Sequence, residues 1–479
     1  MVRLDKKRRG PLMFFLECIA CGARFEAYPP QHDCKKCGGL LEYKFDDETL
    51  KTGKFSGSFT FWRYRKLLPK VKNVVSMGEG GTPLIKAKRL AKNVGLDDLC
   101  FKDETRNPTN SFRDRCATLI VSNAVDLGYG SIVCATNGNL GASLAAYCAK
   151  SGLTCYIVVP KNVDMGKLAQ MLIYDAVIEE HGEIVDDSLK IAYELANEMG
   201  WYQGSAEFNP LSIEALKTIA YEVYEQMGVP DWFIASMGSG GTLYAIWKGF
   251  KELQIRGEAN SLPRMVGVQA EGCSPIVKAY MQNVQEPTLK TKPSTHALAI
   301  LVQNPRYGKL ALKAIKESQG TATSVSDEEI FVAEQEIAKL EGIFAEPASA
   351  ATYAALKKLV NGCVIDRKAK VVCLITGSGL KATDILQALT KRRKTAIVGL
   401  ELSTKEKILR ILCERDAYGY ELWKKLGKVM TRAAVYQHLG ELSRNGLISS
   451  YEKDGRRYFR ITKRGMKALR ALDNLKLLL

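Results

Sequence analysis

The stretch WFIASMGSGGTLYAIWKGF (Trp232–Phe250) decides the fold that we expect for most of this chain. Trp232–Ser236 is a short apolar run of the kind that forms a buried strand, and a helical pattern begins a few residues later. The loop between them is rich in glycine. Backbone N–H groups of such a loop, together with the N-terminus of the following helix, form a cradle for a phosphate group. The residues of this cradle are Gly238, Ser239, Gly240, Gly241 and Thr242.

On both sides of this stretch, between about residues 70 and 390, apolar β-rich runs alternate with amphipathic helical segments. The other expected strands are Ser131–Ala135, Thr154–Val159, Arg264–Val268 and Lys370–Ile375. The expected helices include Ser143–Ser151, Ile213–Met227 and Asp327–Glu341. This alternation is typical of a parallel sheet covered by helices on both faces, so the sequence predicts an α/β fold.

Composition excludes several classes of protein. The 479 residues, 46% hydrophobic and 25% charged, have the profile of an ordinary globular protein of two or three domains. No apolar run approaches the roughly 20 residues that a membrane-spanning helix needs. Thirteen cysteines, an odd number scattered through apolar segments, indicate buried free thiols in a reducing compartment. We therefore expect a cytoplasmic protein with no membrane partner.

The net charge of +17 is unevenly distributed. Residues 391–479 contain 22 Lys or Arg and 9 Asp or Glu, and the first ten residues hold five basic side chains and one acidic one. The chain between these ends is close to neutral. A basic module on a neutral body indicates a partner such as DNA, because contacts of Lys and Arg with phosphates dominate affinity for nucleic acids. The alternative is a basic tail that only improves solubility.

Four cysteines near the start of the chain form two C-x2-C pairs separated by twelve residues. They are Cys18, Cys21, Cys34 and Cys37. Four thiolates at this spacing predict a closed, structural zinc site in a ribbon. Two alternatives remain open: a chance group of free cysteines, and a ribbon that binds nucleic acid through the basic arm before it.

The body of the chain resembles threonine synthases over roughly residues 11–390. The resemblance depends on six motifs that occur in the family's order: Glu79–Leu84, Asn107–Thr109 followed by Ser111–Phe112, Gly138–Asn139, Gly238–Thr242, Glu346–Ala351 and Thr376–Lys381. It implies a two-lobed type II pyridoxal-phosphate fold. It also implies that the glycine loop, which alone is more often a plain turn, holds the phosphate of pyridoxal phosphate. By the same resemblance Asn139 meets the ring hydroxyl, with Asn137 close by, and Ser378 meets the pyridine nitrogen.

One position departs from the family pattern. The resemblance implies a lysine between Ser111–Phe112 and Asp114–Arg115, where this chain has Arg113. That lysine would hold the cofactor as an imine and move protons. A guanidinium is poorly nucleophilic and stays protonated near neutral pH, so arginine takes neither role. We therefore expect non-covalent binding of pyridoxal phosphate, or of an amino acid, a phospho-amino acid or a preformed imine. Arg113 would offer a bidentate donor to the ligand, or else pair with Asp114 or another local carboxylate and bind no ligand.

Four neighbouring residues bear on this expectation. Asn110 and Cys116 stand where the family typically has glycine, and we expect their larger side chains to narrow the space beside the cofactor. Lys102 and Lys381 are the lysines to consider as replacements. We expect Lys102 to be structural and Lys381 to point away from the ring, so neither restores the missing amine.

From Ser403 the sequence predicts a compact winged helix. Helices are expected over Thr404–Cys413, Tyr418–Leu426 and Thr431–Asn445, with Thr431 as the N-cap of the third and Gly446 after its end. Two strands, Leu447–Glu452 and Arg457–Thr462, follow and are joined by a hairpin turn through Asp454–Gly455. A last helix begins at Lys463. Its final residues, Leu475–Leu479, are apolar enough to pair with a partner helix, so a homodimer is expected.

This module resembles the winged helix of PadR-type regulators, on the run Ala434–Leu439 and on Leu442, Gly446–Ile448, Arg456–Arg457, Ile461–Thr462 and Gly465. In such modules the third helix enters the major groove and the wing grips the backbone. The candidate groove residues are Thr431, Arg432, Gln437 and His438, and the candidate phosphate contacts are Lys453, Arg456, Arg457 and Arg460. Tyr436 either stacks on a sugar or packs internally. The alternative for the whole module is a winged helix that contacts protein.

The expected organisation is a basic arm and zinc ribbon (1–50), a threonine-synthase-like body (51–395) and a winged-helix DNA-binding domain (403–479). The leading hypothesis is a transcription regulator that responds to a small-molecule ligand through a catalytically degenerate body. One alternative is a pyridoxal-phosphate-dependent lyase of the threonine synthase class acting on O-phosphohomoserine. Another is an inactive partner that regulates a true threonine synthase.

Overall fold

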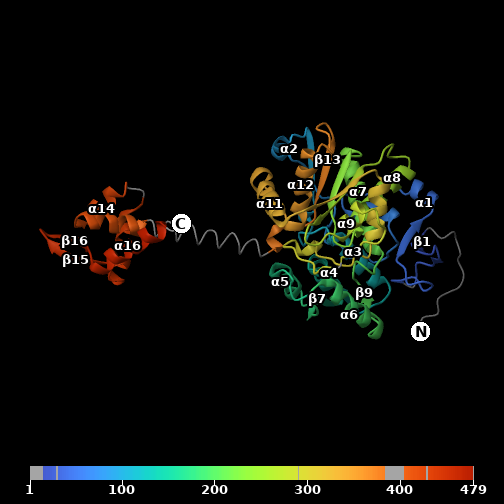
Figure 1. Cartoon of the computed structure of the whole chain (residues 1–479). Coiled ribbons are helices and arrows are strands. Elements are labelled where there is room, and N and C mark those ends of the chain that lie inside the picture. Colours follow the sequence, from blue (N-terminus) through green and yellow to red (C-terminus); the bar gives the residue numbers. More distant parts are fainter. Residues whose placement is uncertain (1–13, 29–30, 290, 383–403, 428–429, 478–479) are drawn as a thin grey trace. The chain divides into compact units, whose positions relative to one another are not determined.

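The structure is a computed structural model, and it describes residues 14–28, 31–289, 291–382, 404–427 and 430–477. The chain divides into two compact units, Met1–Asp384 and Ile385–Leu479, which are described separately (Figure 1). In the part of the chain that is described, no helix combines the length and the apolar character needed to cross a membrane.

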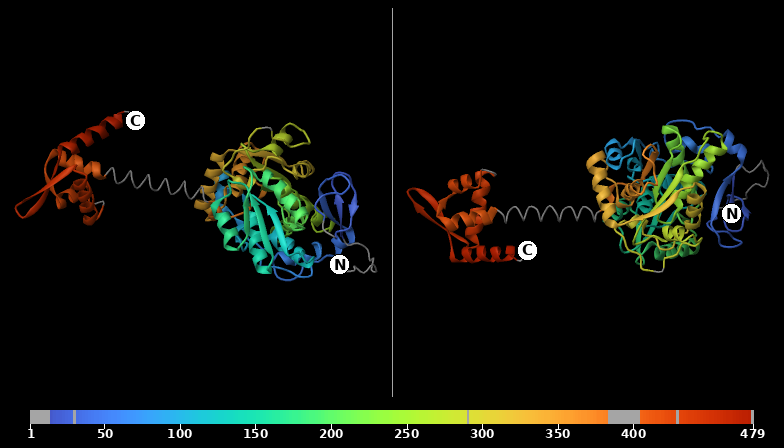
Figure 2. Two further views of the ribbon diagram at one scale, coloured as in Figure 1. Left: turned by 90° about the horizontal axis from the view of Figure 1, so that it is seen from below. Right: turned by 45° about the horizontal axis from the view of Figure 1, so that its top comes forward.

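The first unit begins with a three-stranded antiparallel sheet in the order β2-β1-β3. Its strands are β1 (Phe14–Cys18), β2 (Arg24–Phe25) and β3 (Leu41–Phe45). Leu16, Leu41 and Tyr43 are buried against the rest of the unit. In both views of Figure 2 this sheet, drawn in blue, lies at the rim of the unit. Cys18 ends β1, and the other three N-terminal cysteines lie in the loops that follow β1 and β2.

The smaller lobe of the unit contains a four-stranded parallel sheet in the order β8-β7-β6-β9. The strands are β6 (Ser131–Ala135), β7 (Thr154–Val159), β8 (Val177–Glu180) and β9 (Tyr202–Gln203). Ile132 packs in the same buried cluster as Leu144 of α4 (Asn139–Ser151), whereas Val133 packs in a second cluster with Leu189 of α6 (Val185–Glu198). Because adjacent strand residues point to opposite faces, both faces of the sheet are covered.

The larger lobe contains a six-stranded sheet in the order β12-β11-β10-β13-β5-β4, parallel except for β4. Its strands are β4 (Leu84–Lys86), β5 (Asp98–Asp103), β10 (Trp232–Ser236), β11 (Arg264–Ala270), β12 (Thr321–Val325) and β13 (Lys370–Ile375). In β13, Val372 and Val371 belong to different buried clusters. This sheet therefore also has helices on both faces.

The remaining helices of the unit connect these strands. They are α1 (Asp47–Thr52), η1 (Phe61–Leu67), α2 (Lys88–Val94), η2 (Glu104–Arg106), α3 (Asp114–Asp126), α5 (Met165–Ile173), α7 (Leu211–Met227), α8 (Gly241–Ile255), α9 (Pro275–Met281), η3 (Leu298–Ile300), α10 (Gly308–Glu317), α11 (Asp327–Glu341), α12 (Pro347–Asn361) and η4 (Gly379–Lys381). The expected α/β fold with parallel sheets is confirmed. Four expected strands have the observed bounds, and β11 continues two residues further, to Ala270.

The second unit contains helices and a small antiparallel sheet in the order β14-β16-β15. Residues 404–414 are helical. The elements after them are β14 (Ala417–Tyr418), α14 (Gly419–Lys425), α15 (Arg432–Arg444), β15 (Ile448–Lys453), β16 (Arg456–Ile461) and α16 (Lys463–Leu477). The hairpin turn has φ of 51° at Asp454 and 69° at Gly455, as an Asp-Gly turn between two strands requires. The short strand β14 was not expected.

The caps of α15 agree with the sequence. The Thr431 hydroxyl accepts a hydrogen bond from the Ala434 N–H at 3.3 Å, and Gly446 has φ of 66° beyond the end of the helix. Val435, Leu439 and Leu442 are buried, so this helix keeps its opposite face for solvent.

Candidate functional site

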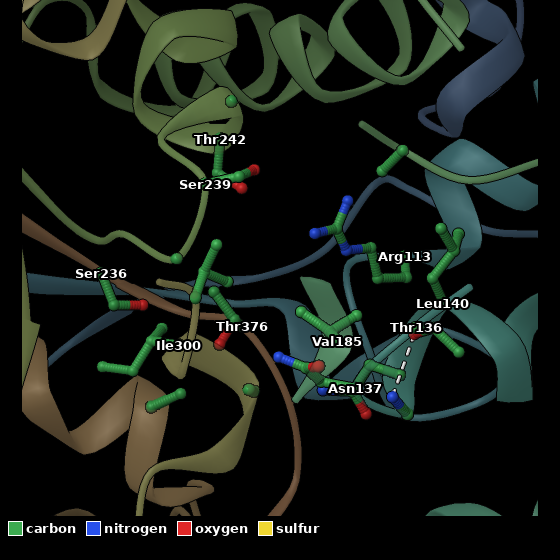
Figure 3. Close-up of a pocket in the computed structure, with 18 of the residues that line it drawn as sticks. Arg113, Thr136, Asn137, Leu140, Val185, Ser236, Ser239, Thr242, Ile300 and Thr376 are labelled. Atoms are coloured by element: carbon green, nitrogen blue, oxygen red, sulfur yellow. Dashed lines mark hydrogen bonds between the residues drawn. The ribbon is translucent and has the colours of Figure 1, made fainter. Parts of the chain in front are cut away.

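A pocket lies in the first unit where strand ends of both sheets meet (Figure 3). It is lined by residues that follow β6, β10 and β13, by the start of α12 and by the segment around η3. The carboxyl ends of parallel strands are the usual ligand site in open α/β sheets, because loops and helix N-termini converge there.

The glycine loop predicted as a phosphate cradle forms one side of this pocket. Gly238, Ser239, Gly240, Gly241 and Thr242 all line the pocket. Gly240 has φ of 91°, and a Cβ there would lie 2.9 Å from the Ala311 Cβ, so the loop needs glycine at this position. The Tyr307 N–H donates to the Ser239 carbonyl at 3.0 Å and fixes the loop. The free N–H groups at the start of α8 remain available to an anion.

The opposite side of the pocket carries two asparagines. Asn139, the first residue of α4, donates through Nδ2 to both carboxylate oxygens of Glu346, at 3.0 and 2.9 Å. Asn137 donates through Nδ2 to the Leu298 carbonyl at 3.0 Å and to the Leu301 carbonyl at 3.3 Å. The Oδ1 atoms of both side chains are buried and have no partner in the described residues.

Glu346 is the buried acidic centre of this side. Its carboxylate lies 3.5 Å from the Nζ of Lys167, a buried α5 side chain that also pairs with Asp164 at 2.6 Å. The Thr376 hydroxyl donates to Glu346 at 3.2 Å and lies 2.8 Å from the Ser349 hydroxyl. Glu346 belongs to one of the six motifs on which the family resemblance depends. Nothing in the sequence indicated that it holds the Asn139 amide.

Ser378, expected at the pyridine nitrogen, does not line the pocket. Its hydroxyl caps η4 and accepts from the Leu380 N–H at 3.3 Å. Thr376, the first residue after β13, lines the pocket in its place. The role expected for Ser378 at the pyridine nitrogen stays a prediction, and Thr376 is the hydroxyl residue of this motif that lines the pocket.

Arg113 lines the pocket, and its guanidinium extends toward the side of Ser239 and Thr242 (Figure 3). The side chain is half-buried, and its guanidinium carbon lies 4.7 Å from the Phe112 ring centroid. It forms no ion pair with any described residue. The expected alternative of a pair with Asp114 is wrong, because the Asp114 carboxylate instead accepts from the Thr109 N–H and hydroxyl, at 2.7 and 2.6 Å.

Arg115, two residues later, is a structural contrast to Arg113. It is fully buried and pairs with Glu104 at 2.7 Å and with Glu222 at 2.6 Å. Burial raises the pKa of Glu222 and the charges of Arg115 and Lys102 lower it, with a net shift down to about 2. Arg115 therefore stabilises the core, whereas Arg113 faces the pocket.

Glu207 is a pocket residue that the sequence did not indicate. It follows the two-residue strand β9, lines the pocket and is half-buried. Burial raises the pKa of its carboxyl, and the nearby charge of Arg113 opposes that rise. The pocket thus contains a cation and an anion that are not in direct contact.

No lysine is found among the residues that line the pocket in the described part of the chain. Lys102 donates to Glu222 at 2.6 Å and to the Thr82 carbonyl at 2.7 Å, and is therefore committed to the core. Lys381 donates to the Thr109 carbonyl at 2.8 Å, and burial lowers its pKa to about 8. Lys167, which the sequence did not single out, is held by its two carboxylates.

Asn110 and Cys116, which we expected to narrow the space beside the cofactor, are not among the residues that line the pocket. Asn110 has φ of 59° and its side chain donates to the Thr105 carbonyl at 3.1 Å, outside the pocket. The left-handed backbone explains why a glycine suits this position. Cys116 is buried in α3, with its Sγ 3.8 Å from the Ser212 carbonyl.

The four N-terminal cysteines converge. All four Sγ atoms lie within 4.8 Å of one another, with Cys18 and Cys37 at 3.5 Å and Cys21 and Cys34 at 3.7 Å. Tetrahedral zinc with Zn–S bonds of about 2.3 Å requires sulfur separations of about 3.8 Å, so the geometry fits that ion. Gly39 is required beside them, because a Cβ there would lie 2.9 Å from the Cys18 Sγ.

The cysteine-bearing sheet is fixed to the helix that begins at the cradle. Glu42 of β3 pairs with Lys248 of α8 at 3.0 Å, and Lys248 pairs with Glu214 at 2.6 Å. Asp33, next to Cys34, pairs with Arg306 at 2.7 Å. The sheet therefore contacts both α8 and the segment whose Tyr307 N–H supports the cradle.

The residues expected to contact DNA lie on α15 and on the β15–β16 hairpin of the second unit. On α15, the Arg432 guanidinium lies over the rings of Tyr420 and Trp423, at 4.9 and 4.8 Å from their centroids. Gln437 contacts Glu441 at 3.4 Å. Thr431 caps the helix, and His438 is half-buried, with no partner in the described residues for its Nδ1.

The hairpin is strongly basic and exposed. Lys453, Arg456, Arg457 and Arg460 are all exposed residues of its two strands. The Arg460 guanidinium pairs with Asp416 at 2.8 Å, and Arg457 donates to the Ser450 hydroxyl at 2.9 Å. Tyr436 of α15 is 52% exposed. The end of its ring also packs closely on Gly419, because a Cβ added to Gly419 would lie 2.4 Å from the Tyr436 ring.

Comparison with known proteins agrees with this architecture. Residues 75–377 match the family described as pyridoxal-phosphate dependent enzymes, and residues 408–471 match the transcriptional regulator PadR-like family. The threonine synthase of Methanosarcina acetivorans is 43% identical over 379 residues, which cover 77% of this chain and 92% of that protein. The threonine synthase of Mycobacterium tuberculosis is 39% identical over 312 residues, covering 65% and 84%.

Solved structures share the fold of the first unit. Maize serine racemase superposes with a TM-score of 0.54 at 18% identity, covering 66% of this chain and 93% of the racemase. The serine racemase of Dictyostelium discoideum gives 0.52 at 23% identity, covering 62% and 92%. The chain thus belongs to the pyridoxal-phosphate dependent enzyme family, with a threonine-synthase-like body followed by a PadR-like domain at its C-terminus.

Proposed function

We propose that this protein is a ligand-responsive transcription regulator whose threonine-synthase-like body senses a small molecule and no longer catalyses the family's chemistry. The observation that carries the proposal is the composition of the pocket: it is lined by a phosphate cradle and by Arg113, and by no lysine of the described chain. The PadR-like domain supplies the link to transcription.

The pocket residues fit a bound pyridoxal phosphate. The N–H groups of Gly238–Thr242 would hold its phosphate, Asn139 would meet its ring hydroxyl, and Thr376 would meet its pyridine nitrogen. Bound pyridoxal phosphate supplies an electron sink for reactions at the α-carbon of an amino acid. Among the described residues no pocket side chain offers the primary amine that would attach the cofactor and then shuttle protons, so binding is reversible.

Arg113 acts in this proposal as an anion contact. Its guanidinium has no carboxylate partner in the described residues, is held against Phe112 and extends toward the cradle side. A planar fork of donors suits a phosphate or carboxylate oxygen pair, and such charge-assisted hydrogen bonds are the strong ones. Replacement of a lysine by this arginine would therefore exchange a covalent anchor for an ionic one.

The cysteine cluster is proposed to hold a structural zinc ion. Four sulfur ligands leave no open coordination position, so the ion would order the ribbon and take no part in chemistry. Because the ribbon pairs with α8 through Glu42 and Lys248, its folding would also support the cradle at the start of that helix.

DNA binding is proposed for the exposed faces of α15 and the hairpin. Thr431, Gln437 and His438 would face base edges, whereas Lys453, Arg456 and Arg457 would contact phosphates. Arg432 and Arg460 are already engaged by aromatic rings and by Asp416, so we assign them a smaller share. A homodimer, which would pair two such domains on DNA, is part of the same proposal.

The test is a fluorescence anisotropy titration of the full chain on a duplex selected by the protein from a random pool, with and without pyridoxal phosphate. We expect the ligand to change the dissociation constant for DNA at least about 5-fold, the lower end of typical allosteric coupling. Arg457→Ala should weaken DNA binding without affecting ligand binding, whereas Lys150→Ala, an exposed substitution in the body, should change neither. An identical DNA affinity with and without ligand would refute regulation by this ligand.

A second function is favoured by one observation, the 43% identity to threonine synthases over most of their length. It is a lyase acting on O-phosphohomoserine. Phosphate release from O-phosphohomoserine by the native chain, abolished by Ser239→Ala in the cradle, would establish that function in place of the regulator.

A further inference from the structure

The hydrogen-bonding polarity of the pocket depends first on the orientation of Asn139. A carboxylate only accepts hydrogen bonds, and both oxygens of Glu346 lie 2.9 to 3.0 Å from one atom of the Asn139 amide. That atom must therefore be the nitrogen. Glu346 is confined in turn, because a Cβ at Gly377 would lie 2.8 Å from its Oε1. The Asn139 amide cannot flip without losing both hydrogen bonds, and its oxygen remains without a donor.

Asn137 has the same polarity for an independent reason. Its amide contacts two backbone carbonyls, those of Leu298 and Leu301, which also only accept. The nitrogen is thereby fixed on that side and the oxygen is left unpaired and buried. Asn139 itself is only 7% exposed, so water does not readily satisfy its oxygen. Two acceptor oxygens of pocket-lining residues therefore lack donors among the residues that the structure describes.

The other side of the pocket is a donor surface. The N–H groups at the start of α8, the hydroxyls of Ser239 and Thr242, and the guanidinium of Arg113 all offer hydrogens. The site is thus polarised, with donors and positive charge on the cradle side and unpaired acceptors on the asparagine side. A ligand that satisfies both sides has an anion at one end and donors at the other.

We propose that the ligand of this pocket is a phosphate ester whose far end carries an amine or hydroxyl group, and that the pocket prefers it to the corresponding aldehyde. The inference deepens the proposed function and rests on its claim that the pocket binds a phosphate ligand reversibly. The ring hydroxyl would donate to the Asn139 oxygen in either form, so the Asn137 oxygen would distinguish them. An aldehyde oxygen only accepts hydrogen bonds and would leave that oxygen without a donor. In an enzyme with a lysine the aldehyde is favoured by covalent attachment, and Arg113 removes that advantage.

The test uses four probes that differ at one group of one ring. They are the 5′-phosphates of pyridoxamine, pyridoxine, pyridoxal and 4′-deoxypyridoxine, which carry an aminomethyl, a hydroxymethyl, an aldehyde and a methyl group. Isothermal titration calorimetry of the full chain gives each dissociation constant. We expect the aminomethyl probe to bind at least about 10-fold more tightly than the methyl probe, with the hydroxymethyl probe between them and the aldehyde close to the methyl probe.

Two variants separate the two sides of the pocket. Ser239→Ala removes a donor that all four probes share, so it should weaken them by the same factor and keep their order. Asn137→Leu removes an unpaired acceptor, so it should weaken the aminomethyl and hydroxymethyl probes selectively and compress the range of the four constants.

The outcomes of this test also separate the inference from the proposed function. Equal binding of the aminomethyl and methyl probes, or tightest binding of the aldehyde, would overturn the preference and leave a phosphate-binding sensor in place. Failure of all four probes to bind would overturn both. Unchanged selectivity in Asn137→Leu would show that the preference does not come from the unpaired oxygen.

Discussion

Arg113 and Arg115 should respond in opposite ways to the same substitution. We predict that Arg115→Ala destabilises the body and that Arg113→Ala spares it while weakening the phosphate ligand. Arg115 is fully buried between Glu104 and Glu222, so its removal leaves two buried carboxylates without their partner. Breaking a buried ion pair in this way costs about 3 to 5 kcal/mol of unfolding free energy.

For Arg113→Ala we expect a much smaller loss of unfolding free energy. The side chain is half-buried and has no ion pair in the described residues, so Arg113→Ala should change the unfolding free energy by no more than about 0.5 kcal/mol. Loss of a charge-assisted contact of about 1.5 to 3 kcal/mol should, in contrast, weaken ligand binding by about 10- to 150-fold.

Urea denaturation followed by tryptophan fluorescence measures the first effect, because four of the five tryptophans (Trp62, Trp201, Trp232 and Trp247) lie in the body. Isothermal titration with pyridoxamine phosphate measures the second. If Arg113→Ala lowered stability as much as Arg115→Ala and left ligand affinity unchanged, Arg113 would be a structural residue and the ionic anchor would be wrong.

Three further predictions concern the ribbon and the link between the pocket and the end of the body. Cys34→Ser should abolish zinc binding measured by elemental analysis, whereas Cys363→Ser, an exposed cysteine outside the cluster, should retain it; equal metal content in both would remove the zinc site. The pKa of Glu42 is raised by burial and lowered by Lys248 and Lys44, to about 2 overall, from an ordinary 4.5. Because the pKa of Glu42 is depressed in the folded state, its contribution of about 3 kcal/mol to the unfolding free energy is present above pH 4.5 and is lost as pH falls toward 2. Glu42→Gln should therefore flatten the dependence of unfolding free energy on pH in that window. An unchanged pH dependence in this variant would count against the pairing of the ribbon with α8. A Cβ at Gly166 of α5 would lie 3.0 Å from the Lys381 carbonyl, near the last described residue of the body. Gly166→Ala should therefore reduce the effect of the ligand on DNA affinity, whereas Gly130→Ala, whose Cβ would meet open space, should not. An equal effect of the ligand in both variants would exclude the contact between Gly166 and Lys381 as the route from the pocket to DNA.

Much of the fold was predictable because its signals are local. The strands β6, β7, β10 and β13 are continuous apolar runs, and their bounds were predicted without error since burial on both faces demands such runs. The start of α4 was placed four residues too late. Asn139 begins this helix after Gly138, whose φ of 130° ends the preceding turn, and neither residue continues the apolar pattern used to find the helix.

The cradle and the cysteine cluster were also predictable, because each lies within one short segment. The acidic residues of the pocket and their contact with the Asn139 amide were not predictable. Glu207 and Glu346 reach the pocket from segments more than 130 residues apart, and Glu346 meets Asn139 only because the two lobes lie against each other. The choice between Thr376 and Ser378 was unpredictable for a related reason: the turn after β13 decides which of these two hydroxyls lines the pocket, and the sequence does not specify that turn.

The covalent state of the native chain with pyridoxal phosphate shows most directly whether the body has lost its covalent anchor for the cofactor. The loaded protein is reduced with borohydride, digested and mapped by mass spectrometry. We expect no modified lysine in the peptides that contain Lys102, Lys167 and Lys381, and full release of the ligand on dialysis before reduction. Stoichiometric attachment to any of these lysines would contradict this expectation and would make the protein an enzyme with a relocated anchor.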